Sequence, residues 1–274
     1  MHEIPEARVL AKQLKETVVG KQVKSAIAGY SPHSFAWYYG DATEYGEMLA
    51  GKTFDDATAF GGFVELHAGA LRLTLGEGAS LRFLQVGEAR PAKHQLLLEF
   101  EDGTALCSTI RMYGAIYCFE EGNMANSWYT VAKEALPYDA PEFTLEFLKS
   151  LLPEKVKSLS VKAFLATEQR IPGLGNGVLQ DILFVSGLHP KRKVTTLSED
   201  DWVRLWEAIR KVMHEMEEQG GRDVETDLFG KSGGYLTALS AKTKGKPCLI
   251  CGEEIRREAY LGGNIYYCPH CQPL

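Results

Sequence analysis

Long apolar runs are missing from this chain of 274 residues, and none approaches the roughly 18 residues that a membrane-spanning helix needs. Residues 1–21 carry charges throughout and have no apolar centre, so we do not expect a secretory signal. Internal repeats and low-complexity tracts are also absent. An excess of basic residues is lacking too, because the formal net charge is −6. This balance disfavours a simple basic protein that coats nucleic acid, although a single face can still be basic.

What is present is typical of a folded protein. Apolar residues make up 45% of the chain and charged residues 24%, which is too hydrophobic for a disordered chain. At roughly 100–200 residues per domain, this length predicts one large domain or two modest ones.

The spacing of apolar residues changes along the chain. Apolar residues recur at helical spacing over 7–18, and strand-like sequence follows to about residue 120. Within it, 71–75 alternates like a half-buried strand, and Asp102-Gly103 indicates a hairpin turn. From about residue 143 the pattern becomes helical. Strands first and helices second predict an α+β protein with separate domains, divided between residues 121 and 142.

Two helix starts in the second half carry capping signals. Ser160 precedes an expected helix over 161–170. Ser198, with Asp201 three residues later, resembles a capping box and opens a helix whose inward face runs from Trp202 to Met216. We expect that helix to stop at Gly220-Gly221.

Four of the six cysteines lie in the last 27 residues, as two Cys-x-x-Cys pairs separated by sixteen residues. Such knuckles place four thiolates on one metal, and a closed four-cysteine set favours structural tetrahedral zinc. The predicted ligands are Cys248, Cys251, Cys268 and Cys271. Iron in the same cage, or disulfides, are the alternatives. Between the pairs, 262–264 indicates a β-hairpin, while Cys107 and Cys118 are expected to be reduced core thiols.

Pro172-Gly-Leu-Gly-Asn176 separates two helical segments. Glycines let a ligand approach the backbone, and a helix start offers free amides, so this turn could hold an anion such as a phosphate beside Lys162. The plainer interpretation is an ordinary turn. The basic clusters at 191–193 and 242–246 also have two interpretations: they are solvated loops, or they contact phosphates.

These pieces together resemble one family. The sequence is similar, in order and over nearly its whole length, to the formamidopyrimidine-DNA glycosylase and endonuclease VIII family. The residues that carry the resemblance are Met1-His-Glu-Ile-Pro-Glu6, Lys162, Pro172–Asn176, Asp181–Phe184, Gly187–Pro190, Gly220-Gly221, Gly234-Tyr235 and the cysteine module ending in Cys271-Gln272.

The resemblance implies a DNA repair fold. It implies an N-terminal β-sandwich with a leading helix over 1–132, a helical helix–two-turn–helix domain over 133–240, and a zinc finger over 241–274. Damaged double-stranded DNA would lie in the cleft with one nucleotide flipped out, because a stacked base cannot be reached. A cytoplasmic monomer, associated with the nucleoid in a prokaryote and needing no membrane, is the matching expectation.

The resemblance also implies roles for individual residues. Lys162 and Asn176 would hold phosphates near the lesion, with Gly175 in the same DNA-binding turn, and Asn264 can hydrogen-bond a base or a phosphate. Arg111 and Tyr113 would fill the gap and wedge the opposite strand. In the family, the N-terminal amine attacks the sugar and a neighbouring glutamate handles protons. The corresponding candidates here are Met1, His2, Glu3 and Glu6.

Several positions depart from the family pattern. His2 replaces the usual proline, so the amine would belong to Met1 if the methionine is retained. Gly62 occupies the place of a common lysine, and Glu77 the place of a wedge methionine. The expected finger arginine falls on Gly263 or Asn264. The resemblance therefore predicts a DNA glycosylase, and these departures disfavour the strand-cleaving lyase activity of the family.

Other classes of function are compatible with the residues alone. The same scaffold could bind damaged or distorted DNA without cutting it, or the zinc module could contact proteins or RNA. An enzyme of another kind is less favoured, since the scattered histidines show no spacing typical of a catalytic zinc centre.

Overall fold

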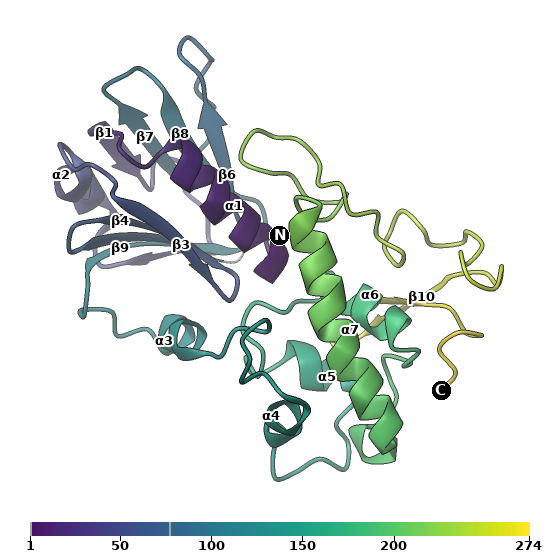
Figure 1. Cartoon of the computed structure of the whole chain (residues 1–274). Helices are drawn as coiled ribbons and strands as arrows, with labels where there is room; N and C mark the ends of the chain where they lie inside the picture. Colours follow the sequence, from purple (N-terminus) through teal and green to yellow (C-terminus); the bar gives the residue numbers. More distant parts are fainter. Residues whose placement is uncertain (1, 77) are drawn as a thin grey trace.

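A computed structural model describes residues 2–76 and 78–274. The expected first helix is present as α1 (Ile4–Thr17), which begins at Glu3. Glu3 and Glu6 form a capping box, in which each carboxylate accepts a backbone N–H of the first turn. Figure 1 shows α1 crossing from the sheets toward the helical half, so that the N-terminus lies where the two halves meet.

Two sheets make up most of the first half. One has the order β1-β7-β8-β6 and the other the order β2-β9-β5-β4-β3. The strands of the first are β1 (Val23–Ala28), β7 (Leu96–Phe100), β8 (Ala105–Ile110) and β6 (Ala79–Leu84). Those of the second are β2 (Ala36–Tyr39), β9 (Gly114–Glu120), β5 (Leu71–Gly76), β4 (Phe63–Ala68) and β3 (Asp56–Phe60). A short 3-10 turn (Ala42–Glu44) and α2 (Tyr45–Leu49) follow β2.

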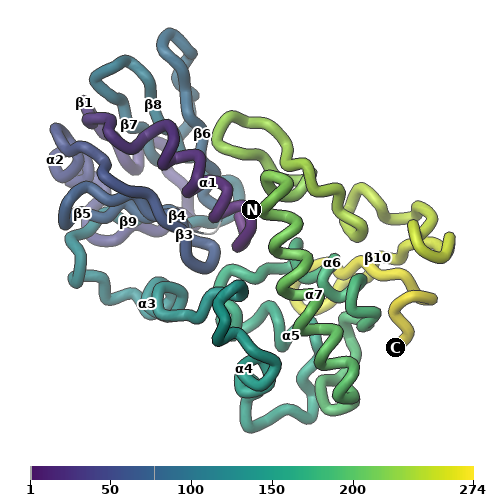
Figure 2. Tube along the Cα trace, viewed as in Figure 1, coloured from purple at the N-terminus to yellow at the C-terminus, as the bar shows by residue number. Residues whose placement is uncertain are grey.

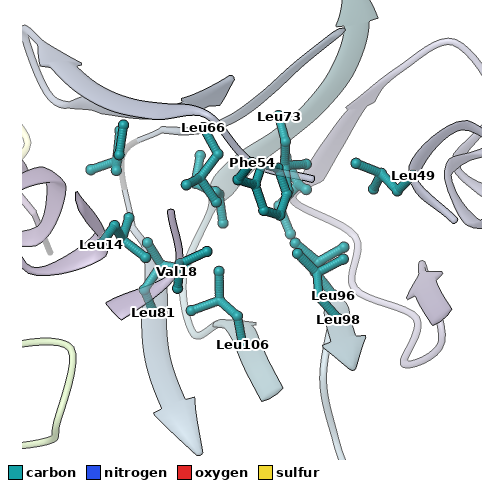
Figure 3. Packing of buried hydrophobic residues seen from close by; sticks show 14 of the residues in the cluster. Leu14, Val18, Leu49, Phe54, Leu66, Leu73, Leu81, Leu96, Leu98 and Leu106 are labelled. Atoms are coloured by element: carbon teal, nitrogen blue, oxygen red, sulfur yellow. The ribbon is translucent and has the colours of Figure 1, made fainter. Parts of the chain in front are cut away.

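The apolar core lies between these sheets and α1. Leu14 comes from α1, Leu66 and Leu73 from one sheet, and Leu98 and Leu106 from the other, and all are buried. Figure 3 shows these side chains converging. Burial of such a continuous apolar layer is the main stabilising contribution to this half.

The predicted hairpin at Asp102-Gly103 is confirmed, since it joins the antiparallel pair β7 and β8. Asp102 accepts a hydrogen bond from the Thr104 amide at 3.0 Å, and Gly103 has a φ of 81°. Glycine adopts this left-handed conformation without strain.

The half-buried pattern predicted for β5 is wrong, because both faces of that strand are buried. The outer face lies beneath α3 (Ser127–Glu134), which contributes Tyr129 to an aromatic cluster there. The polar side chains of β5 are satisfied inside this layer: Thr74 donates to Glu65 and Arg72 pairs with Glu121.

The second half is helical, with α4 (Leu145–Ser150), α5 (Val161–Ala166), α6 (Val178–Val185) and α7 (Glu199–Glu218), and a 3-10 turn (Val194–Thr196) before α7. Figure 2 shows α5 and α6 beside the long α7. The helix expected over 161–170 is shorter than predicted. Glu168 and Gln169 adopt positive φ angles of 58° and 47°, which a helix cannot contain.

The capping box at Ser198 is confirmed. Ser198 Oγ accepts the Asp201 amide at 3.1 Å, and the Asp201 carboxylate accepts the Ser198 amide at 2.9 Å. The predicted inward face of α7, from Trp202 to Met216, is buried. The expected stop at Gly220-Gly221 is correct to within two residues.

The chain ends in an antiparallel hairpin of β10 (Arg256–Tyr260) and β11 (Gly263–Tyr267). Sheets in the first half and helices in the second confirm the α+β class. The division at residue 132 falls inside α3, and it stays a proposal. No helix in the described ranges is long and apolar enough to cross a membrane.

Candidate nucleic-acid interface and metal centre

The start of α1 is fastened to the glycine turn of the helical half. The Glu3 carboxylate accepts the backbone N–H groups of Gly175, Gly177 and Val178 at 3.0, 2.8 and 2.8 Å. The Ile4 amide donates to the Gly173 carbonyl at 3.1 Å. The turn therefore is an anion site, and its anion is a side chain of the same protein.

This arrangement corrects one sequence-based prediction. The sequence predicts a Gly175 amide that is free for a DNA phosphate, but this amide is bound by Glu3, as are two amides that follow it. Glycine is needed here for space: a Cβ at position 175 would lie 2.7 Å from Glu3 Cδ. We therefore assign Gly175 to the positioning of Glu3.

Backbone meets backbone at another glycine of the same turn. Gly173 has a φ of 80°, and a Cβ there would collide with the Gly62 amide of the turn between β3 and β4. A Cβ on Gly61 would lie 3.2 Å from the Pro172 carbonyl oxygen. The two halves of the molecule thus touch through main-chain atoms.

Arg222 joins the two N-terminal carboxylates and was missed from the sequence. Its guanidinium is 2% exposed and lies 2.8 Å from Glu6 Oε2 and 3.3 Å from Glu3 Oε1. The Arg222 amide also donates to Glu6. A single arginine after Gly220-Gly221 gives no local signal of burial, so only the fold reveals this network.

The two carboxylates differ in their electrostatics. Burial raises the pKa of Glu3, and the Arg222 charge and the amide donors oppose that shift. Burial alone would also raise the pKa of Glu6, but the charge and hydrogen bonds of Arg222 outweigh it, so this pKa lies below its usual value. Every hydrogen bond described for the Glu3 carboxylate is one it accepts from an N–H group, which suits its ionised form.

His2 is buried at the same junction, and burial lowers its pKa to about 4. This is below the range near neutrality that would suit proton transfer. The imidazole is therefore neutral at pH 7, and it can accept a proton there but not donate one as a cation. Met1, the other candidate for the amine, lies outside the described residues.

A cavity of about 510 Å³ opens beside His2. Arg111 and Met112 line it from the loop between β8 and β9, and residues 224–227 line it from the segment that follows Arg222. The structure therefore brings His2 and Arg111 to one cavity. Tyr113 instead lies with its ring centroid 5.9 Å from that of Trp37. Glu77, aligned with the wedge methionine, lies outside the described residues.

Lys162, Asn176 and the finger hairpin come together on the other side of the glycine turn. Lys162 Nζ donates to the Tyr260 carbonyl at 2.6 Å, and Asn176 Nδ2 donates to the Asn264 carbonyl at 2.9 Å. A Cβ on Gly263 would lie 3.6 Å from Lys162 Nζ. Burial lowers the pKa of Lys162.

Two further residues at this point were not found from the sequence. Gln180 of α6 donates to the carbonyls of Asn176 and Asn264 and accepts the Tyr266 amide, which fixes the hairpin to the helix. Arg257 of β10 donates through Nε to the Asn264 side chain at 2.8 Å. The hairpin thus carries an arginine, on the strand before the expected position.

The predicted metal ligands form one cluster. Their four Sγ atoms lie within 4.8 Å of one another. Sγ separations of 3.8 Å for Cys248–Cys271 and 3.4 Å for Cys251–Cys268 are too long for a disulfide and suit thiolates around one ion. This donor set fits tetrahedral zinc. Gln272 supports it, accepting the Cys268 amide and donating to the Leu188 carbonyl.

The remaining cysteines are free and buried, as predicted. Burial raises the pKa of Cys107 to about 11 and that of Cys118 to about 12, so both thiols stay protonated and inert.

Ion pairs with other parts of the protein engage some residues of each basic cluster. Lys191 pairs with Glu258, Arg192 with Asp201 at 2.7 Å, and Lys242 with Asp223 at 2.8 Å. These ion pairs favour a structural interpretation of the 191–193 cluster, whereas Lys244 and Lys246 of the second cluster are exposed.

Comparison with known proteins agrees with this geometry. Residues 131–227 match the model of the formamidopyrimidine-DNA glycosylase H2TH domain. A formamidopyrimidine-DNA glycosylase of Bacillus cereus (strain ATCC 10987 / NRS 248) is 28% identical over 279 residues, covering 100% of this chain and 99% of the relative. One of Listeria innocua serovar 6a is 28% identical over 281 residues, covering 99% and 100%.

The chain is thus similar over its whole length to formamidopyrimidine-DNA glycosylases. Solved structures share its fold. Lactococcus lactis Fpg in complex with DNA containing an abasic site superposes with a TM-score of 0.83 at 21% identity, covering 99% of this chain and 100% of that one. MutM (Fpg) from Thermus thermophilus gives 0.81 at 23% identity, with 98% of both chains covered. The residues that match the H2TH model include the glycine turn and Arg222.

Proposed function

We propose that this protein is a DNA repair glycosylase that binds damaged double-stranded DNA as a monomer and cleaves an N-glycosidic bond. The family supports the class of reaction, and the relatives are named for it. The observation that carries the proposal is the position of the N-terminal residues. Glu3 binds the glycine turn where the two halves meet, and its neighbour His2 lines a cavity that Arg111 also lines.

In this proposal, the cavity, Glu3 and His2 have separate roles. A nucleotide flipped out of the stack would enter the cavity beside His2. Glu3 acts as a positioning residue, because three amides and Arg222 hold its carboxylate and fix the start of α1. The imidazole of His2 lines the cavity, and because burial keeps it neutral at pH 7 it can accept a hydrogen bond from the attacking water.

We propose base excision without efficient strand cleavage. The family lysine is replaced by Gly62, whose amide lies against Gly173. The amine is displaced by one residue where Met1 is retained. Both changes weaken the imine chemistry that strand cleavage requires, and neither removes the cavity or the contacts expected to hold DNA.

The test combines intact mass with borohydride trapping. The mass shows which residue carries the free amine, and trapping on abasic-site DNA shows whether it reacts. We expect base release from at least one lesion in a broad panel without a covalent adduct. A trapped adduct would show lyase chemistry and contradict the second part of the proposal. No release from any lesion would contradict the first.

A second candidate is a protein that binds damaged DNA without cutting it. The full engagement of the Glu3 carboxylate favours it, since a proton-transferring carboxylate usually keeps one oxygen accessible. The two candidates differ in base release alone, and the lesion panel separates them.

We propose that Lys162, Asn176 and Asn264 form the phosphate contact, with Arg111 and Tyr113 at the opposite strand. Lys162→Ala and Asn176→Ala are expected to weaken DNA binding while leaving the fold intact. The Lys162 change should also reduce the slope of log affinity against log salt by about 1, because one counterion fewer is released. Fluorescence anisotropy at several salt concentrations measures both effects.

Lys211→Ala is the matched control, because this lysine is 64% exposed on α7 and belongs to an i,i+4 pair. If the Lys162 and Asn176 variants bind duplex DNA as the control does, the phosphate assignment is incorrect.

Stability is expected to fall between neutral pH and about pH 4. The pKa of His2 is about 4 in the folded protein and 6.5 in the unfolded one, so unfolding takes up a proton in this interval. The stabilisation by neutral His2 is complete above pH 6.5 and is lost as the pH falls, by about 3 kcal/mol in total. Urea unfolding at pH 7 and pH 5 measures it.

His2→Gln removes the titrating group and is expected to flatten this part of the pH profile. An unchanged slope in that variant would show that other groups cause it.

A further inference from the structure

The outer face of the five-stranded sheet contains a second cavity, of about 540 Å³, that the proposed reaction does not use. It opens where α3 stops covering the sheet, at the start of β9 and the end of β5. Its walls are aromatic: Trp37 from β2, Phe63 from β4, Tyr117 from β9 and Trp128 from α3. We call these residues the aromatic groove.

The hollow has a cause in the strand register. Ala115 of β9 pairs with Trp37 on one side and with Gly76 of β5 on the other. Two small residues therefore sit side by side between large rings. A Cβ on Gly76 would collide with the Phe63 ring, which rests over that position. Small residues therefore form the bottom of the groove, and large aromatic rings form its sides.

The groove leaves large apolar rings in contact with solvent. Trp37 is 48% exposed and Trp128 is 47% exposed. None of the described residues that line it is charged. The Asn126 amide and the Tyr117 hydroxyl, 3.4 Å apart, supply polar atoms at its wall. Flat aromatic walls with a few hydrogen-bonding atoms suit a neutral, planar, heteroaromatic ligand.

The groove is continuous with the proposed DNA interface. Tyr113, which the resemblance places against the strand opposite the lesion, has its ring 5.9 Å from that of Trp37. At the other side, the Trp128 carbonyl accepts a hydrogen bond from Gln169, just ahead of the glycine turn. A ligand in the groove would therefore lie next to bound DNA, on the side of the unbroken strand.

We propose that the aromatic groove binds an unpaired nucleobase of the DNA strand opposite the lesion, by stacking it against Trp37. The inference rests on the proposed DNA binding and deepens it, because the protein then reads both nucleotides of the disrupted pair. Stacking tolerates all four bases, since each presents a flat π face. The groove accordingly selects for an unpaired base and not for its identity.

The experiment uses the full chain and two duplexes with a stable abasic analogue in one strand. The first carries 2-aminopurine opposite the analogue, and the second carries an abasic analogue there also, so that no base can enter the groove. We expect the intact protein to bind the first duplex more tightly. We also expect 2-aminopurine fluorescence to stay low on binding, because the base moves from the DNA stack onto an indole.

Trp37→Ala is expected to lose about tenfold in affinity for the first duplex alone, with a rise in 2-aminopurine fluorescence. Trp37→Phe should retain most of both signals. Tyr30→Ala is the control, because Tyr30 is 62% exposed and stacks on His94 outside the groove.

Equal affinity of the intact protein for both duplexes would overturn the inference, as would a Trp37→Ala variant that keeps the difference between them. The proposed glycosylase activity fails separately. If no base is released but the protein still binds the first duplex more tightly, only the glycosylase proposal is contradicted. If bases are released but the two duplexes bind equally, only the proposed role of the aromatic groove is contradicted.

Discussion

Replacing Arg222 by methionine is expected to cost about 3–5 kcal/mol of unfolding free energy, because two buried carboxylates then lose the one cation described between them. The Glu3 and Glu6 side chains are nearly as buried as the arginine, at 5% and 4% exposure. Water cannot replace the guanidinium at this depth. Urea unfolding at pH 7 measures the loss.

Arg82→Met is the matched control, since Arg82 is 51% exposed and pairs with Glu88 at the surface at 3.1 Å. Such a pair contributes about 0–1 kcal/mol. A second variant, with both Arg222→Met and Glu6→Gln, should recover part of the loss by removing one uncompensated charge. If Arg222→Met unfolds like the control, Arg222 does not neutralise the N-terminal carboxylates.

Removal of zinc is expected to have the other large effect. We propose that the four-cysteine cluster holds one structural zinc ion, and metal binding at such sites contributes about 10–16 kcal/mol. Cys251→Ser, or a strong chelator, should release the metal, unfold the hairpin of β10 and β11, and abolish DNA binding. Atomic absorption gives the metal content, and anisotropy gives the affinity.

Cys107→Ala serves as the control, because that thiol is buried in the sheets and far from the cluster in sequence. It should keep one metal ion per chain. Full metal content in the Cys251→Ser variant would contradict the ligand assignment.

The DNA affinity in this experiment also reports on the contact between hairpin and helix. Gln180 and Asn176 hold the hairpin through the backbone carbonyl of Asn264 and the amide of Tyr266. Their partners disappear when the hairpin unfolds, so the Lys162 region loses its shape although its own residues are unchanged.

Local signals were sufficient for much of the fold. The capping residues of α5 and α7, the hairpin at Asp102-Gly103 and the spacing of the cysteines each act within a few residues. Such signals are legible in a sequence because the interacting atoms are neighbours along the chain.

Long-range contacts explain the failures. The outer face of β5 is buried by α3, more than fifty residues later, and the amides of the glycine turn bind Glu3, more than 170 residues earlier. The sequence near either position contains no signal that identifies the residues it will contact. Arg222 illustrates the same limit, because nothing in the neighbouring sequence indicates that its side chain is buried.

The direct meeting of Gly173 with Gly62 fixes the separation of the two halves at the thickness of two polypeptide backbones. No side chain lies between the two backbones there, so the distance between the halves cannot be adjusted by exchanging one side chain for a similar one. Any other residue at position 173 would act as a wedge, tilting the sheets away from the helices and changing the width available to a duplex.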